Sequence, residues 1–222
     1  MLRSTIGAHR ASPLLALRHR RPHRAILALA LASSVLVPLG VAPSAGATTT
    51  PVVAPAGTVA LTTTTIDKPW YSVERYYLGL LNCTRTGGWV LRDGTCRGYG
   101  SGHFSAYVPP IVYSYGISDR VSRPYARTLA IGNLCTHSAD GDPGTRLRRA
   151  DYLRWAWGEN IGCRDGYASA KAAVLASHLV FQSEKSTNGG HWKNIKNRAY
   201  HWVGIGIWRS SSRTRLVVDF YG

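Results

Sequence analysis

Three glutamates occur in this chain, and one of them sits where an acid is costly to bury. Glu159 stands between Trp157 and Ile161, and the alternation of a β-strand would place all three side chains on one face. A carboxylate that shares a face with Trp and Ile is partly removed from water, so it needs a partner. The sequence therefore predicts a hydrogen-bond donor or a cation close to Glu159.

His137 is the expected partner of Glu159. It lies two residues after Cys135, and Glu159 lies four residues before Cys163. A disulfide between these cysteines would hold their Cα atoms roughly 5.5 Å apart. Two extended residues reach at most about 7 Å and four about 14 Å. The two side chains can therefore meet, although this geometry does not force them to.

Glu184 and His191 form a second candidate pair, because they flank a Gly-Gly loop that can turn back on itself. Two imidazoles and two carboxylates facing one cleft could bind a divalent ion such as zinc through neutral imidazole nitrogens. They could equally orient a water molecule, with Glu159 or Glu184 as the base. In the structural alternative, each histidine is hydrogen-bonded only for stability.

The four cysteines predict two disulfide bonds. All of them follow the N-terminal leader, and an even number in an exported chain is typical of a disulfide framework. Of the three possible pairings we favour Cys83–Cys96 and Cys135–Cys163, because neighbours along the chain close the shorter loops. A zinc site made of these cysteines is disfavoured, since no C-x-x-C pair exists.

Residues 1–47 predict a secretory signal peptide. They carry six arginines and no acidic residue, followed by seventeen mostly apolar residues and the A-x-A pattern Ala45-Gly46-Ala47. Arg20-Arg21 leaves twin-arginine export as an alternative. An uncleaved anchor is a second one, although the apolar run is shorter than the about 20 residues of a membrane span. The predicted protein is secreted and extracellular, and it is not transmembrane once the peptide is cleaved.

The rest of the chain divides into a linker and one domain. Residues 48–69 are rich in Thr, Pro and Ala and predict a linker, and residues 70–222 predict a folded domain. Beyond the leader, 21 basic residues face 11 acidic ones, which favours an anionic cell-envelope polymer or a lipid as partner. A basic face that serves only solubility is the alternative. No nucleic-acid-binding module is recognisable, so no specific nucleic acid is expected.

The spacing of apolar residues predicts helices on both sides of a small, mainly antiparallel sheet. The fold class is therefore α/β, a three-layer α-β-α sandwich that is disulfide-bonded. The predicted helices cover residues 71–82, 122–134 (capped by Ser122) and 168–184 (opened by Ser169 or Asp165), with a short turn at 191–195; the predicted strands cover 155–162, 202–209 and 215–221.

Several strings between Trp70 and Gly222 resemble, in the right order, the motifs of the CAP superfamily, also called SCP domains or the cysteine-rich secretory protein family. They are Leu80–Gly87 for the L-N-x-x-R-x-x-G opening helix, Cys135–Ser138 for the H-S loop, Gly158–Ile161 for the G-E-N-I strand, Gly190–Ile195 for the G-H-R-x-N-I element, and Val203–Ile207 with Asp219-Phe220 for the closing strands.

The resemblance implies a cavity lined by His137, Glu159, Glu184 and His191 in a secreted, basic protein. Members of the family bind sterols, other lipids, metal ions or protein partners, and some have been proposed as proteases. The tryptophan usual in the third helix is missing, and His178 or Phe181 is expected in its place.

Three functions follow, in order of preference. The first is a secreted, non-enzymatic binding or interaction module whose cleft takes a divalent metal, a lipid or an envelope ligand. The second is an extracellular, protease-like hydrolase that uses Glu159 and Glu184. The third is a structural cell-surface protein. Enzymatic activity is disfavoured because the chain has neither a G-x-S-x-G elbow nor an H-E-x-x-H helix.

Overall fold

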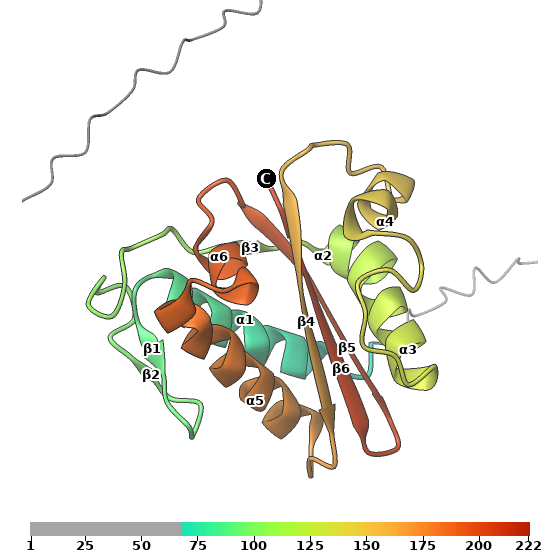
Figure 1. Cartoon of the computed structure of the whole chain (residues 1–222), viewed down its shortest axis with the longest axis horizontal. Helices are drawn as coiled ribbons and strands as arrows, with labels where there is room; N and C mark the ends of the chain where they lie inside the picture. Colours follow the sequence, from blue (N-terminus) through green and yellow to red (C-terminus); the bar gives the residue numbers. More distant parts are fainter. Residues whose placement is uncertain (1–67) are drawn as a thin grey trace, which may run out of the picture. The chain divides into compact units, whose positions relative to one another are not determined.

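A four-stranded sheet runs through the part of the chain that the computed structural model describes, residues 68–222. The predicted signal peptide and nearly all of the predicted linker lie outside the described residues. The strand order is β3-β5-β6-β4, with β3 parallel to β5 and the other neighbours antiparallel (Figure 1). The strands are β3 (Val112–Tyr113), β4 (Trp157–Asp165), β5 (Trp202–Ser210) and β6 (Arg213–Tyr221).

Strand β5 has one bulky face and one bare face. Val203, Ile205 and Ile207 are buried on the first face, whereas Gly204 and Gly206 alternate with them on the second. A Cβ atom added to Gly206 would lie 2.1 Å from backbone atoms of Ser122. Glycine at this position therefore lets a helix pack directly on the strand backbone.

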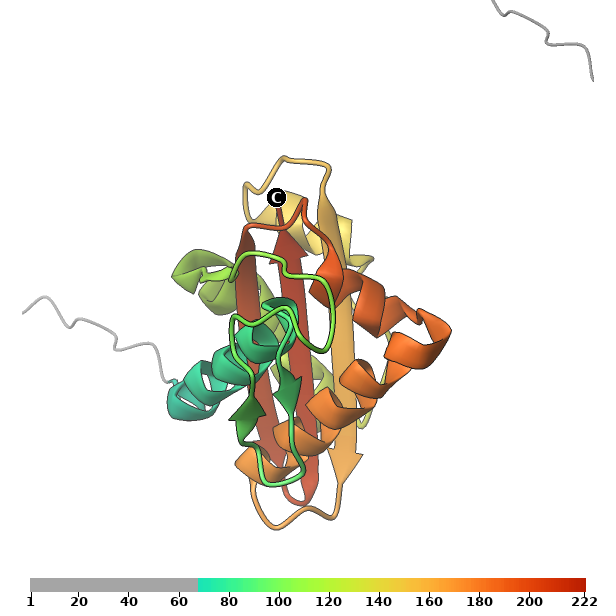
Figure 2. The ribbon, with the colours of Figure 1, turned by 90° about the vertical axis from the view of Figure 1, so that its left-hand side faces the viewer.

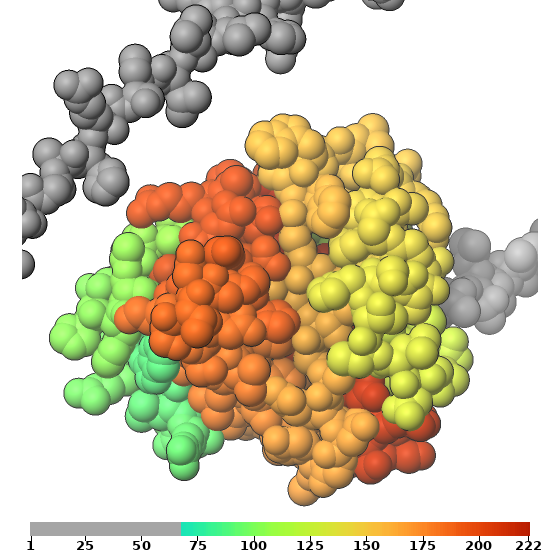
Figure 3. Space-filling model, viewed as in Figure 1, coloured from blue at the N-terminus to red at the C-terminus, as the bar shows by residue number. Residues whose placement is uncertain are grey.

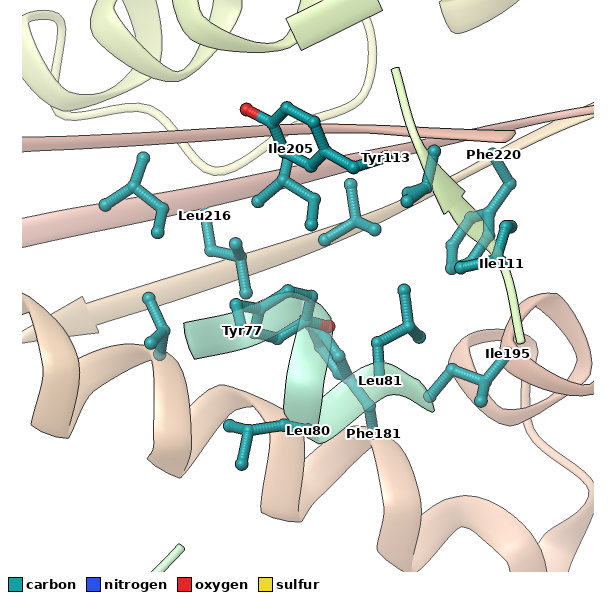
Figure 4. Packing of buried hydrophobic residues seen from close by; sticks show 14 of the residues in the cluster. Tyr77, Leu80, Leu81, Ile111, Tyr113, Phe181, Ile195, Ile205, Leu216 and Phe220 are labelled. Atoms are coloured by element: carbon teal, nitrogen blue, oxygen red, sulfur yellow. The ribbon is translucent and has the colours of Figure 1, made fainter. Parts of the chain in front are cut away.

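Three helices cover the bulky face: α1 (Tyr71–Arg85), α5 (Ala170–Ser183) and α6 (Gly190–Lys196). Figures 1 and 2 show them together on one side of the sheet. The core between them holds Tyr77, Leu81, Phe181, Ile205 and Phe220, each at most 2% exposed (Figure 4). Each such side chain contributes about 1.5–3 kcal/mol by leaving water.

The opposite face is covered by α2 (Tyr115–Ile117), the π-helical turn η1 (Ser118–Ser122), α3 (Arg123–Ile131) and α4 (Pro143–Arg149). The predicted cap at Ser122 is wrong, because the helical backbone continues through this residue and its hydroxyl donates to Asp219 instead. Ser114 caps the run by accepting a hydrogen bond from the backbone N–H of Ile117. The architecture is thus the predicted disulfide-bonded α-β-α sandwich.

Smaller elements complete the domain. They are the antiparallel pair β1 (Trp89–Val90) and β2 (Cys96–Arg97) and the 3-10 turn η2 (Glu184–Thr187). Both favoured disulfides, Cys83–Cys96 and Cys135–Cys163, are present. Ser169 caps α5, as one of its two predicted caps. No helix among residues 68–222 has the length and apolarity needed to cross a membrane.

His178 and Phe181 both lie in the core, where one of them was expected to replace a tryptophan. The Nε2 atom of His178 is 2.8 Å from Oγ1 of Thr84, and that hydroxyl donates to Gln182. Thr84 therefore accepts from a neutral His178 that carries its proton on Nε2. Complete burial lowers the pKa of His178 to about 3, which keeps the ring uncharged.

Candidate functional site: two histidine–glutamate pairs beside an edge strand

The first pair consists of His137 and Glu159. The Nδ1 atom of His137 lies 2.6 Å from Oε1 of Glu159, and the second carboxylate oxygen accepts from Arg146. The Glu159 side chain is 1% exposed and that of His137 is 54% exposed. The carboxylate is therefore buried, as its place in the strand predicted, and it holds a ring that faces solvent.

The loop that carries His137 is fixed from three sides. The Cys135–Cys163 disulfide ties its start to β4. The Tyr125 hydroxyl donates to the carbonyl of Thr136 at 2.6 Å and accepts from the N–H of Ala139 at 3.1 Å. Arg146 donates to the carbonyl of His137 at 2.8 Å. These contacts hold the imidazole over Glu159.

Arg146, the second partner of the Glu159 carboxylate, was not predicted from the sequence. It belongs to α4, whose side chains read only as a basic run, T-R-L-R-R. Its guanidinium stacks on the Tyr125 ring at 3.5 Å and is almost fully buried. The helix itself had a readable start, because Asp142 caps it and Pro143 follows at its first position.

Asp219 lies directly opposite Glu159 in the β4–β6 register and is fully buried. Ser122 donates a hydrogen bond to its Oδ2 atom at 2.6 Å. Burial, and then the negative charge of Glu159, hold the pKa of Asp219 well above its usual range. We therefore read Asp219 as a neutral acid beside Glu159.

The second pair consists of Glu184 and His191. The His191 Nδ1 atom is 2.6 Å from Oε1 of Glu184, and the backbone N–H of His191 donates to Oε2 at 2.9 Å. The His191 ring stacks on Phe181, with centroids 4.2 Å apart. A Cβ atom at Gly189 would lie 2.4 Å from Oε2 of Glu184, so a larger residue there would displace the Glu184 side chain.

Burial acts to raise the pKa of Glu184, but the hydrogen bonds and charge of His191 and the N–H of Trp192 outweigh it. The pKa of Glu184 is therefore lowered. Because Oε2 accepts a backbone N–H in the first turn of α6, the carboxylate also caps that helix.

Two asparagines hold α6 against β4 and so place the second pair beside the edge strand. Asn160 donates to the carbonyl of His191 at 3.2 Å. Asn194 donates to the carbonyl of Glu159 at 3.1 Å and to Oδ1 of Asn160 at 2.8 Å. A Cβ atom at Gly158 would lie 2.7 Å from Oδ1 of Asn194, so glycine is needed for this approach.

The structure therefore makes two His–Glu pairs from the four predicted residues, one carried by the His137 loop and β4, the other by η2 and α6. In Figure 3, the surface of α6 lies on one side of β4 and the segment from residue 135 to 150 on the other. Neither Nε2 atom of the two histidines has a hydrogen-bond partner among residues 68–222. Within that same part of the chain, no three His, Cys, Asp or Glu side chains are grouped as a metal site.

No family model matches the chain, and neither does any curated protein. Among solved structures it is similar to an extracellular SCP-domain protein from Bacillus anthracis, at 20% identity and a TM-score of 0.41 over 51% of this chain and 34% of that one. It is also similar to an outer surface protein of Borrelia burgdorferi (12% identity, TM-score 0.47, 68% and 93% covered) and to NaASP2, determined with Zn²⁺ (15%, 0.45, 68% and 79%).

The structural neighbours of the chain thus include SCP-domain proteins, the class that its motifs resemble. The chain spans about a third of the length of the Bacillus protein. At these identities and TM-scores, the likenesses carry no statement about ligand or activity.

Proposed function

We propose that this chain is a secreted binding module of the CAP type whose two His–Glu pairs present imidazole nitrogens to a ligand. The observation that carries the proposal is the orientation of the rings. Each histidine directs its Nδ1 atom to a carboxylate. Its Nε2 atom, on the other side of the ring, has no hydrogen-bond partner among residues 68–222 and is open to a ligand. Histidines that bind metals commonly make this same bond to a carboxylate, which fixes the tautomer and the ring orientation.

A divalent ion such as zinc is the simplest ligand that fits these donors. Neutral imidazole suits zinc, and His137 and His191 would supply the Nε2 atoms, with Glu159 and Glu184 behind them. Because the described residues offer no group of three donors, such an ion would keep positions for water or a further ligand. We therefore expect micromolar or weaker affinity.

The engagement of both carboxylates supports binding over hydrolysis. Each oxygen of Glu159 already accepts a hydrogen bond, from His137 or Arg146. Both oxygens of Glu184 accept from His191. A carboxylate acting as a general base must be within reach of a water molecule. The Glu159 side chain is 1% exposed, so the hydrolase alternative would have to open this pair to water.

Two disulfides support the extracellular placement, since such bonds persist in oxidising surroundings.

Titration calorimetry with zinc chloride tests the proposal. We expect the purified exported protein to bind zinc, and the double variant His137→Ala, His191→Ala to give no binding heat. His201→Ala is the matched control, because His201 is exposed and belongs to neither pair, and it should bind as the wild type does.

Identical titrations of the wild type and the double variant would reject the ion site. The single variants separate one shared site from two independent ones. If His137 and His191 hold one ion together, either substitution alone removes binding; full binding after either single change contradicts a shared site.

A further inference from the structure

The segment between α4 and β4 exposes two large apolar side chains. Trp155 is 89% exposed and Leu153 is 77% exposed, the highest values among the large hydrophobic residues of the described part of the chain. A single exposed apolar side chain is ordinary at a protein surface, whereas a contiguous exposed apolar patch commonly marks an interaction site.

This exposure is built into the fold. The Tyr152 ring packs edge-on against Tyr221, with centroids 5.3 Å apart. The backbone N–H of Arg154 donates to the Tyr221 hydroxyl at 2.8 Å. With Tyr152 packed inward, the residues on either side of Arg154 point away from the sheet. The segment is therefore anchored at alternate residues and presents Leu153 and Trp155 to the outside.

Arginines flank the two apolar side chains. Arg148, Arg149 and Arg154 are exposed, against one exposed acid in the same stretch, Asp151. Arg149 pairs with Asp140 at 2.8 Å, and Asp151 lies 3.8 Å from Arg120.

Two of these arginines have no carboxylate within salt-bridge distance among residues 68–222. Arg148 donates to Thr145, and the Arg154 guanidinium lies 5.2 Å from the centre of the Trp202 ring. Trp202, Arg154 and Tyr152 all line one cavity of about 220 Å³. Residues 148–155 therefore carry two positive charges, on Arg148 and Arg154, that no salt bridge within the described residues neutralises.

From this arrangement we infer that residues 148–155 dock the protein on an anionic lipid bilayer, with Leu153 and Trp155 entering the headgroup layer and Arg148 and Arg154 contacting lipid phosphates. Tryptophan concentrates at the boundary between headgroups and acyl chains. Arginine and lysine near the surface are attracted to anionic lipids. The segment supplies both features within eight residues.

A bilayer fits this segment better than a protein partner does. A stable protein interface buries about 800 Å² on each side and uses some 20 to 30 residues. Here two protruding side chains among arginines offer far less apolar area, but they suffice for shallow insertion helped by charge. The inference does not depend on the His–Glu pairs, so the two proposals fail separately.

Vesicle flotation tests the inference. Vesicles of phosphatidylglycerol and phosphatidylcholine in equal parts should retain the exported protein at least ten-fold more strongly than phosphatidylcholine alone. The variant Leu153→Ser, Trp155→Ser should lose at least ten-fold in retention. The variant Arg148→Gln, Arg154→Gln should lose several-fold and become less sensitive to salt.

Matched controls remove the same chemistry elsewhere. Tyr99→Ser with Ile131→Ser takes away two other exposed apolar side chains, and Arg92→Gln with Lys171→Gln removes two exposed charges. Both should float as the wild type does. All eight side chains that the tests and controls change are exposed, and circular dichroism checks that each variant folds.

Two results would overturn the inference. One is retention of Leu153→Ser, Trp155→Ser equal to that of the wild type. The other is displacement of the protein from the vesicles by soluble polyphosphate at equal phosphate concentration, because that result would assign the binding to charge alone and favour an anionic polymer. Retention that survives polyphosphate and needs Trp155 supports the bilayer.

Discussion

The two His–Glu pairs share one bond and differ in almost everything around it. In both, an imidazole Nδ1 lies 2.6 Å from a carboxylate oxygen. Glu159, however, is 1% exposed, whereas Glu184 is 26% exposed. Glu159 meets His137 across 22 residues, and Glu184 meets His191 across seven.

The difference separates a tertiary pair from a local one. The first pair exists only because a disulfide, Tyr125 and Arg146 bring the His137 loop onto β4. The second is formed locally, between η2 and the first turn of α6, and it caps α6. A buried ion pair is costly to break, because the partner left behind is an uncompensated charge, whereas a pair near the surface is worth little.

Glu159→Gln should be the most damaging single change at the site. Glutamine keeps the shape of the side chain but removes the charge that faces Arg146, which is buried. We expect a loss of about 3–5 kcal/mol in the free energy of unfolding. Urea unfolding followed by circular dichroism measures it. A loss below about 1 kcal/mol would mean that another group, such as Asp219, takes over the charge of Arg146.

Removal of the Cys135–Cys163 disulfide should act next in size and on one pair only. This bond closes a loop of 28 residues, and the loop-entropy model gives it roughly 3.5 kcal/mol. In Cys135→Ala, Cys163→Ala, we expect the Nδ1–H proton signal of His137 to disappear from the NMR spectrum while that of His191 remains.

The control is Cys83→Ala, Cys96→Ala, which opens a loop of 13 residues, worth about 3 kcal/mol in the same model, and touches neither pair. Both His signals should persist there. Loss of both signals in either variant would show that the pairs are not independent.

Glu184→Gln should have the smallest effect, under about 1 kcal/mol at neutral pH, because the pair is partly exposed. The pKa of Glu184 is lowered in the folded protein. Its contribution is therefore present above the unfolded-state pKa of about 4.3 and is lost as the pH falls through the folded-state pKa. Unfolding measured from pH 7 to pH 3 should show a flatter acid decline in the variant than in the wild type. Parallel curves would contradict the role given to Glu184.

The sequence predicted the structure best where a local residue pattern has one physical explanation. The hairpin of β5 and β6, the cap at Ser169 and the need of Glu159 for a partner all followed from local pattern. The predicted bounds of β4 were also close: the strand covers Trp157–Asp165, and residues 155–162 were predicted. Trp155 belongs to the predicted strand 155–162, but it precedes β4 and is 89% exposed.

Sequence pattern failed where the contact partner is distant and nothing local marks it. Arg146 reads as one more surface arginine of a basic helix, and only the tertiary fold buries it against Glu159. The start of the second helix was misplaced because Ser122 looks like a cap, whereas its hydroxyl serves Asp219. The asparagines that hold α6 on β4 were visible in the motifs, but their contacts could not be derived from spacing.

The shortness of β3 leaves most of one flank of the sheet without a neighbouring strand. Only Trp202 and Val203 of β5 pair with β3, so the backbone of β5 from Ile205 onward would offer free N–H groups to another molecule. The Ser118 hydroxyl takes the N–H of Ile205 at 2.8 Å, and the helical run packed on Gly204 and Gly206 lies across that side. A polar side chain and a helix thus cover part of this edge, where a further strand would otherwise pair, and they leave less of it open to the strand of another molecule.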